Sequence, residues 1–294
     1  MSKTKANGIQ IEYETFGNAS GRPLLLIMGL GGQLIFWNED FCRELASRGH
    51  YVIIYDNRDV GLSTKFDQAG EPDIIGTFMK IHSGDKSGVP YMMEDMADDG
   101  AGLLDALGIA SAHICGISMG GMIAQTIAIR HPSKVLTLTS IMSTTGNPDL
   151  PQPRPDVQAA LVAPPPLERN ANIEYQVGIF RMLAGCGFPH DEEWTRKVMT
   201  QSYDRCLYPQ GMGRQTIAIM AQNNRKAALA SLKTPTLVIH GTDDPLVPLE
   251  GGKDTAASIG GAKLLLIEGM GHDLPRGAWS QIVDAISELT QKAG

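Results

Sequence analysis

Two patterns of hydrophobic and polar residues alternate along much of this chain of 294 residues. Between several apolar runs, apolar residues recur at the spacing of one helical face, as in segments 94–108, 121–131 and 279–289. The runs themselves are continuously apolar, which is typical of strands covered on both faces. They are "LLLIM" from Leu24, "YVIIY" from Tyr51, "HICGI" from His113, "VLTLTSIM" from Val135, "TLVIH" from Thr236 and "KLLLI" from Lys263. The alternation predicts an α/β fold with a mostly parallel, doubly wound sheet of about eight strands.

Two stretches depart from this alternation. Near the start, "GIQIEYETFG" alternates apolar and polar residues, which predicts an antiparallel edge strand with one face in water. From residue 143 to 230, proline-rich stretches are followed by helical patterns at 173–183, 191–206 and 213–232. We therefore predict that residues 143–230 form a helical cap subdomain, inserted into an α/β core of residues 1–142 and 231–294.

Composition and charge limit the classes of function. The chain is 43% apolar and 19% charged, as expected of a globular protein that buries a large core. A net charge of −7 argues against nucleic-acid binding, which needs a basic surface. No apolar stretch is long enough for a signal peptide or a membrane span, which predicts a cytoplasmic protein without membrane association.

The four cysteines are far apart in the sequence and form no metal-binding pattern. Cys42, Cys115, Cys186 and Cys206 are therefore predicted to be reduced, buried thiols. A disulfide between Cys186 and Cys206 is the alternative if the protein is exported.

A serine lies between two glycines in "HICGISMGGMIAQ", where a predicted strand passes into a predicted helix. A nucleophilic serine needs exposure, a nearby base and hydrogen-bond donors for the oxyanion that it creates. A sharp strand-to-helix turn at Ser118 would supply the exposure, and it would need glycine at 116 and 120 to avoid collisions. The helix from Met119 would direct free N–H groups at the reacting centre. The alternative is a tight turn in which Ser118 only caps the helix.

A base and an acid follow the last two predicted strands. His272 lies in "EGMGHDLP", while Asp243 and Asp244 lie in "HGTDDPLVP". Both loops leave the carboxyl ends of strands, where open parallel sheets gather their ligand-binding residues. The chain order serine, aspartate, histidine is that of one known triad. The other histidines in predicted strands or at a helix end, His113, His131 and His240, are assigned to the core or to capping.

These motifs resemble those of the α/β-hydrolase fold family, over residues 7–142 and 232–292. The resemblance implies that Ser118 is the nucleophile and His272 the base. It also implies that Asp244 is the acid, because in the family the aspartate next to the apolar "xxVP" segment has that role. Asp149 is the alternative acid, since some members carry the acid after the earlier strand.

A closer similarity is to carboxylesterases of the aclacinomycin methylesterase type, through "LIMGLGG" and "YDNRDVGLST" with Asp59 where the family usually has glycine. Many family members begin the oxyanion loop with His-Gly, whereas this chain has Met28-Gly29. The resemblance implies an oxyanion hole formed by the N–H groups of Leu30 and Met119. Gly29 and Trp37 are candidate substrate-pocket residues, with simple core packing as the alternative for Trp37.

The resemblance implies a serine hydrolase that cleaves small-molecule carboxylic esters, with short to medium acyl chains or as small methyl esters, through an acyl-serine. It implies no metal or organic cofactor, and we expect a monomer or homodimer. Lactone hydrolysis, carbon–carbon bond hydrolysis and perhydrolysis are alternatives on the same triad. A non-catalytic ligand receptor on this fold is the alternative from another class. The cap helices could also serve dimerisation or contact with lipid.

Overall fold

The computed structural model describes residues 1–293 and contains one sheet of eight strands in the order β1-β2-β4-β3-β5-β6-β7-β8. Neighbouring strands from β4 to β8 pair in parallel, whereas β1 and β2 are antiparallel to their neighbours. This sheet confirms the predicted fold class. The strands are β1 Ser2–Ala6, β2 Ile9–Phe16, β3 Arg22–Ile27, β4 His50–Tyr55, β5 Ala112–Ile117, β6 Val135–Ile141, β7 Thr236–Gly241 and β8 Lys263–Ile267.

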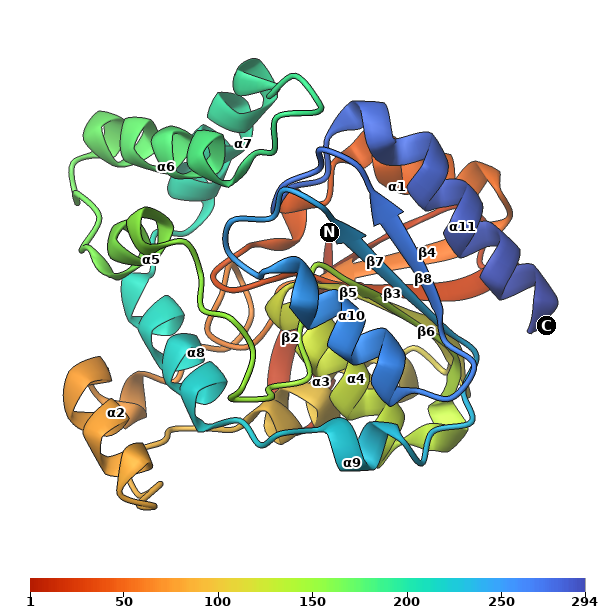
Figure 1. The fold of residues 1–294 in the computed structure, drawn as a ribbon, viewed down its shortest axis with the longest axis horizontal. Coiled ribbons are helices and arrows are strands. Elements are labelled where there is room, and N and C mark those ends of the chain that lie inside the picture. Colours follow the sequence, from red (N-terminus) through yellow and green to blue (C-terminus); the bar gives the residue numbers. More distant parts are fainter. Residues whose placement is uncertain (294) are drawn as a thin grey trace.

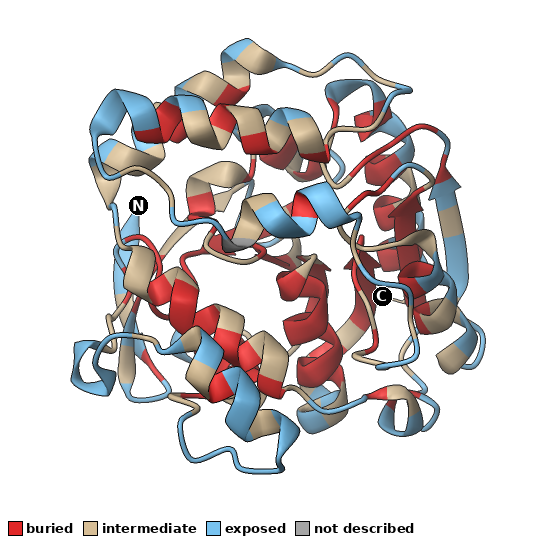
Figure 2. Ribbon diagram, turned by 60° about the vertical axis from the view of Figure 1, so that its left-hand side comes forward, coloured by how far each residue is buried: buried red, intermediate tan, exposed pale blue. Residues whose placement is uncertain are grey.

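Helices cover both faces of the sheet (Figure 1). One face packs against α1 (Glu39–Ser47) and α11 (Trp279–Lys292). The other packs against α3 (Met93–Ala106), α4 (Met119–Arg130) and α10 (Leu249–Ser258). The central strands and the inner sides of these helices are largely buried (Figure 2). The continuously apolar runs of the central strands follow from this double coverage.

The two edges of the sheet differ from the prediction. Strand β1 pairs with β2, so the segment expected at the edge has a further strand outside it. At the other edge, the run "KLLLI" forms β8, but Leu264 and Leu266 are 38% and 39% exposed. An edge strand has a neighbour on one side only, so its side chains are less covered than those of the central strands. The inference that this run is covered on both faces is therefore wrong for β8.

Five helices lie between β6 and β7 along the chain. They are α5 (Pro155–Val162), α6 (Arg169–Leu183), α7 (Glu192–Arg205), α8 (Pro209–Ala221) and α9 (Lys226–Leu229). Helices α6 and α7 pack together through a small apolar cluster of their own. The predicted helix over 213–232 is divided, because α8 ends at Ala221 and Gln222 is extended.

A further helix, α2 (Ile74–His82), packs against α8 and was not predicted from the sequence. The short 3-10 helices are Leu34–Phe36, Asp67–Ala69, Pro132–Lys134 and Arg276–Ala278.

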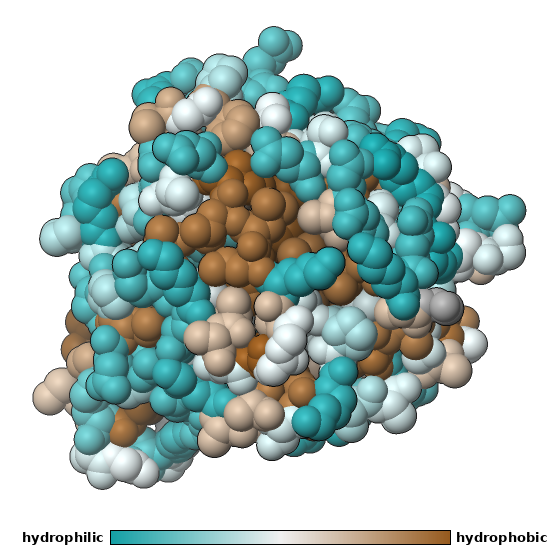
Figure 3. All heavy atoms as spheres, turned by 45° about the vertical axis from the view of Figure 1, so that its right-hand side comes forward, coloured by the Kyte–Doolittle hydropathy of each residue, from teal (hydrophilic) through white to brown (hydrophobic). Residues whose placement is uncertain are grey.

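No helix within residues 1–293 has the length and apolar character needed to cross a bilayer. On one face of the molecule, hydrophobic residues gather in an area that hydrophilic residues surround (Figure 3).

The turn from β5 into α4 brings two backbone segments into direct contact. A Cβ atom at Gly116 would lie 2.0 Å from the carbonyl oxygen of Gly120. A Cβ atom at Gly120 would lie 2.1 Å from the carbonyl oxygen of Ile27 in β3. Real Cβ atoms do not approach backbone oxygens so closely, so both positions require glycine. This packing sets the start of α4 tightly against the ends of β5 and β3.

The substitution Gly120→Ala should lower the free energy of unfolding by about 3 kcal/mol or more, because the new methyl group meets rigid backbone. Gly178→Ala is the matched control, since a Cβ atom at this position of α6 has no neighbour within 4 Å. The control should stabilise the protein by about 0.5–1 kcal/mol through helix propensity. Urea unfolding measures both changes. Equal stabilities of the two variants would contradict the proposed close packing.

Candidate active site

Four loops that follow parallel strands meet at the side of the sheet where the carboxyl ends of these strands lie. Leu30 follows β3, Ser118 follows β5, Asp244 follows β7 and His272 follows β8. The carboxyl ends of parallel strands lie on the same side, which brings together residues far apart in the sequence. Ser118, Leu30 and His272 line one cavity of about 1390 Å³.

Ser118 occupies a strained backbone conformation at the turn between β5 and α4. Its φ of 54° lies in the left-handed region, which is uncommon for residues other than glycine. The surroundings hold this conformation: the Ser118 N–H donates to Ile141 O at 3.0 Å, and the Ser143 hydroxyl donates to Ser118 O at 2.8 Å. Strain that is kept in this way is common at functional sites. The Ser118 residue is thereby fixed at the wall of the cavity.

Asp244 and His272 form a hydrogen-bonded pair. The Asp244 side chain is fully buried, and its Oδ1 accepts from the N–H groups of Leu246 and Val247 at 2.9 and 2.8 Å. Its Oδ2 lies 2.7 Å from Nδ1 of His272. Donation from Nδ1–H to this carboxylate leaves Nε2 as the free acceptor of the ring.

The other candidate acids do not contact His272. Asp149 is exposed and uses its own backbone N–H to contact Asn147. Asp243 accepts a hydrogen bond from the thiol of Cys186 at 2.6 Å. Of the three aspartates considered from the sequence, Asp244 alone pairs with the histidine.

Ser118 and His272 share the cavity wall, but no hydrogen bond joins their side chains in the part of the chain that the structure describes. Such contacts are often long without a ligand and shorten in the complex with substrate. The His272 backbone N–H donates to Leu183 O at the end of α6, at 2.8 Å. The histidine loop is therefore tied to a helix that also borders the cavity.

The predicted oxyanion-hole residues lie next to the serine. A Cβ atom at Gly29 would be 3.2 Å from the Cβ and 3.7 Å from the Oγ of Ser118, so the Gly29–Leu30 backbone passes close to the hydroxyl. Met119 is the first residue of α4, where backbone N–H groups have no partner within the helix. Gly29 lines the cavity as expected from the sequence.

Trp37 does not line the cavity, contrary to the prediction. It is 2% exposed and stacks on Phe41, with ring centroids 6.1 Å apart. The short helix Leu34–Phe36 turns the chain so that Phe36 borders the cavity, whereas Trp37 packs in the core between the sheet and α1. The pattern of the sequence does not distinguish these two neighbouring aromatic residues.

All four cysteines are free thiols, so the alternative disulfide between Cys186 and Cys206 is not formed. Cys42 and Cys115 are buried, and burial raises the pKa of each thiol. Cys186 is exposed and Cys206 is half-buried, so the prediction of buried thiols is wrong for these two. Within residues 1–293, no group of three or more His, Cys, Asp or Glu side chains is placed to bind a metal ion.

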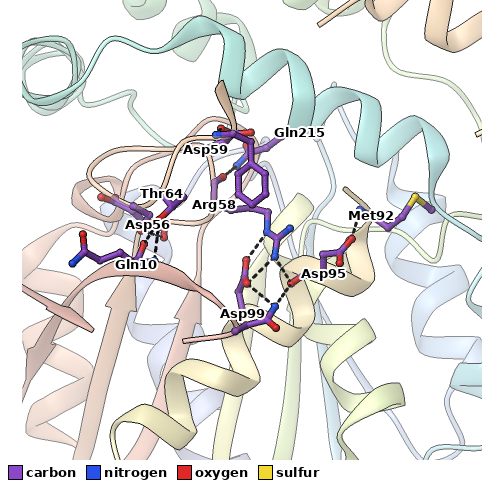
Figure 4. A network of polar contacts seen from close by, with 12 residues as sticks. Gln10, Asp56, Arg58, Asp59, Thr64, Met92, Asp95, Asp99 and Gln215 are labelled. Carbon is purple, nitrogen blue, oxygen red and sulfur yellow. Dashed lines mark hydrogen bonds and ion pairs between the residues drawn. The ribbon is translucent and has the colours of Figure 1, made fainter. Parts of the chain in front are cut away.

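Asp59 has a structural role that the sequence analysis missed. Its φ is 66°, a conformation that explains why glycine is usual at this position. The aspartate side chain compensates, since its Oδ2 pairs with Nε of the buried Arg214 of α8 at 2.8 Å and its Oδ1 accepts from the Phe66 N–H at 2.7 Å. The preceding Arg58 forms a second buried pair with Asp99 of α3, at 2.6 Å between Nε and Oδ2. Figure 4 shows both residues in their polar network.

Asp273, next to His272, is a further cavity residue that the sequence analysis did not select. Its Oδ1 is buried without a hydrogen-bond partner among the described residues. Burial raises the pKa of the Asp273 carboxyl to about 6, against the opposing effect of nearby His272. The signal available in the sequence is an acidic residue directly after the candidate base, within an otherwise apolar loop.

Comparisons with known proteins agree with the observed fold. The model of the alpha/beta hydrolase fold family matches residues 22–275. The rhodomycin D methylesterase DauP of Streptomyces sp. (strain C5) is 30% identical over an alignment of 303 positions, gaps included, which covers 95% of this chain and 94% of that protein. This relative confirms the resemblance to methylesterases that the motifs indicated.

Solved structures show the same fold at lower sequence identity. A meta-cleavage product hydrolase from Pseudomonas fluorescens IP01 has a TM-score of 0.76 at 19% identity, covering 100% of this chain and 98% of that one. An enol-lactonase from Burkholderia xenovorans LB400 has a TM-score of 0.71 at 19% identity, covering 99% of both chains.

The raised pKa of Asp273 gives stability a defined pH dependence. In the unfolded chain the carboxyl ionises near pH 4, whereas the folded protein keeps the proton up to about pH 6. Ionisation of the buried group therefore lowers the free energy of unfolding as pH rises through this window. Asp273→Asn removes the penalty, so its stability relative to wild type should increase by about 2 kcal/mol between pH 4 and pH 8. Urea unfolding at the two pH values measures the difference, and a constant difference would refute the assignment.

Proposed function

Because the chain belongs to the α/β-hydrolase fold family, we propose that Ser118, His272 and Asp244 form the catalytic triad of an enzyme that hydrolyses carboxylic esters of small molecules. The observation that carries this proposal is the pairing of His272 with the buried Asp244, in a loop that borders the same cavity as the strained Ser118. The bond from Nδ1–H to the carboxylate sets the tautomer in which Nε2 can take a proton.

In the first half of the reaction, Ser118 Oγ attacks the ester carbonyl as His272 Nε2 takes the hydroxyl proton. Asp244 stabilises the imidazolium that forms, and its two backbone hydrogen bonds keep the carboxylate oriented. The N–H groups of Leu30 and Met119 bind the negative charge that develops on the carbonyl oxygen. His272 then protonates the departing alkoxide, which leaves as the alcohol and gives an acyl-serine.

In the second half, a water molecule attacks the carbonyl carbon of the acyl-serine while His272 Nε2 accepts its proton. The same two N–H groups hold the second oxyanion. Its collapse breaks the bond to Ser118 Oγ, and His272 returns the proton to that oxygen. The products are the carboxylic acid and the restored enzyme.

The cavity supports a bulky substrate. At about 1390 Å³ it exceeds the size of most small-molecule sites, and short acyl groups would leave most of it unfilled. Helices α6, α7 and α8 contribute mainly apolar walls, among them Ile179, Phe180, Leu183, Met199, Met212 and Met220. We propose a large, mostly apolar acid esterified with a small alcohol such as methanol. The methylesterase name of the relative supports the small alcohol.

We also propose that residues 143–230 form a cap subdomain over a core of residues 1–142 and 231–294. Support comes from the five helices that lie between β6 and β7, four of which (α5, α6, α7 and α8) line the cavity. The Leu183 contact to the His272 loop is consistent with a cap that rests on the catalytic loops.

The proposed nucleophile is tested by Ser118→Ala. Because the hydroxyl is the attacking group, kcat/KM for p-nitrophenyl butyrate should fall by about 10⁴-fold or more, with the thermal unfolding temperature unchanged within a few degrees. Ser258→Ala, in α10, is the control and should keep wild-type activity. A fluorophosphonate probe should label wild type and the control but not Ser118→Ala. Full activity of Ser118→Ala would refute the triad.

Substrate preference is tested with two matched series of esters. In methyl esters of increasingly large apolar acids, kcat/KM should rise by about tenfold or more as the acid fills the cavity. In esters of one acid with increasingly large alcohols, kcat/KM should fall. Lactones of similar size form the third arm, and a preference for them over methyl esters would instead identify a lactonase.

A further inference from the structure

The loop from Met28 to Gly32, here called the oxyanion loop, is held by three hydrogen bonds in succession. The Asn57 side chain donates to Met28 O at 3.0 Å. The N–H of Gly32 donates to Gly29 O at 3.2 Å. The N–H of Gly31 donates to Oε1 of Gln215, in α8, at 2.9 Å. Gln215 is therefore the one contact in this series that comes from the helices between β6 and β7.

Gln215 is fully buried and both ends of its amide are used. While Oε1 accepts from Gly31, Nε2 donates to Arg58 O at 2.8 Å. One partner is a donor and the other an acceptor, so the orientation of the amide is fixed by its contacts. Figure 4 shows the Gln215 side chain reaching the backbone at Arg58. A glutamine at this position joins the oxyanion loop to the segment that follows β4.

These bonds determine the direction of the Leu30 N–H. The peptide group between Gly29 and Leu30 is planar and trans, so its N–H points opposite to its carbonyl. The carbonyl of Gly29 is turned toward Gly32 by their hydrogen bond. On the other side of Leu30, the next peptide group is fixed by Gln215. With both flanking peptide groups held, the Leu30 N–H has one orientation.

Helix α8 is itself anchored beside this loop. Arg214 forms a buried ion pair with Asp59, and the side chain of Met212 lies against Gly31, where a Cβ atom would meet it at 3.2 Å. Gly31, the residue that Gln215 binds, has a left-handed φ of 66°. Its N–H donates to Gln215, and neither the Arg214–Asp59 pair nor the packing of Met212 provides that hydrogen bond.

We propose that Gln215 is a positioning residue for the oxyanion hole, which orients the Leu30 N–H in a loop that has Met28 in place of the histidine common in the family. This inference rests on the proposed esterase function. Gln215 does not line the cavity among the described residues, so it acts through the loop and does not touch the substrate. Loss of its contact should weaken binding of the transition state more than binding of the ester itself.

The test compares Gln215→Met with wild type on the best ester of the substrate series. Methionine is similar in length but offers the Gly31 N–H no comparable acceptor. The variant should lose about 10–100-fold in kcat, with KM changed less than about threefold. All rates are divided by the concentration of active sites, titrated with a fluorophosphonate, so that partial unfolding does not count as lost catalysis. Affinity for a trifluoromethyl ketone that mimics the oxyanion should fall in parallel with kcat/KM.

Two further variants separate positioning from stability. Gln215→Glu keeps an acceptor for Gly31, so its kcat per active site should be at least about fivefold higher than that of Gln215→Met. Ile217→Val, a buried position of α8 outside the loop contacts, should stay within about twofold of wild type. If Gln215→Met does not fold, the one-methylene-shorter Gln215→Asn replaces it with the same expected loss.

The outcomes distinguish the inference from the function on which it rests. An inactive Ser118→Ala together with a Gln215→Met variant of wild-type kcat per active site would overturn the role of Gln215 and leave the triad intact. Equal losses in Gln215→Met and Gln215→Glu would also overturn it. A Ser118→Ala variant that keeps full activity would overturn the proposed function itself.

Discussion

The contact between the backbones of β5 and α4 is the constraint on which the rest of the site depends. Because Gly116 meets Gly120 and Gly120 meets Ile27 without side chains between them, the chain must reverse direction within a few residues. Ser118 occupies the point of reversal and takes up the strain in a φ of 54°. The same contact places the start of α4 and the end of β3 side by side. Ser118 and the loop from Met28 to Gly32 are thus brought together by one packing requirement.

Buried ion pairs connect the segment after β4 to the helices around it. Arg58 pairs with Asp99 in α3, Asp59 pairs with Arg214 in α8, and Asp56 pairs with Arg205 in α7. Burying charges has a high desolvation cost, so such pairs contribute less to stability than to a unique arrangement of their elements. Two of these pairs fix α7 and α8, which border the cavity, relative to the segment after β4. Backbone strain at Asp59 is tolerated because its carboxylate has two partners.

Local patterns in the sequence predicted the parallel sheet and the serine turn, because both depend on short stretches such as the apolar runs and the two glycines. The pairing of Asp244 with His272 was anticipated from a family resemblance and from the rule that parallel strands end on one side. Gln215, by contrast, is functional in our proposal only through contacts with residues far away in the sequence. The signal available in the sequence was a polar residue, Gln215, three positions before Ala218 and therefore on the same helical face. Trp37 was assigned to the pocket because burial and pocket lining favour the same residue types.

The order of these elements along the chain has a consequence during protein synthesis. The serine turn leaves the ribosome early, whereas His272 follows the last strand of the sheet and α11 follows it. Under the proposed triad, a nascent chain that has already folded its first strands still lacks the base that would activate Ser118. Ester hydrolysis by this triad would then begin only after the loop that carries His272 has been synthesised and has joined the sheet.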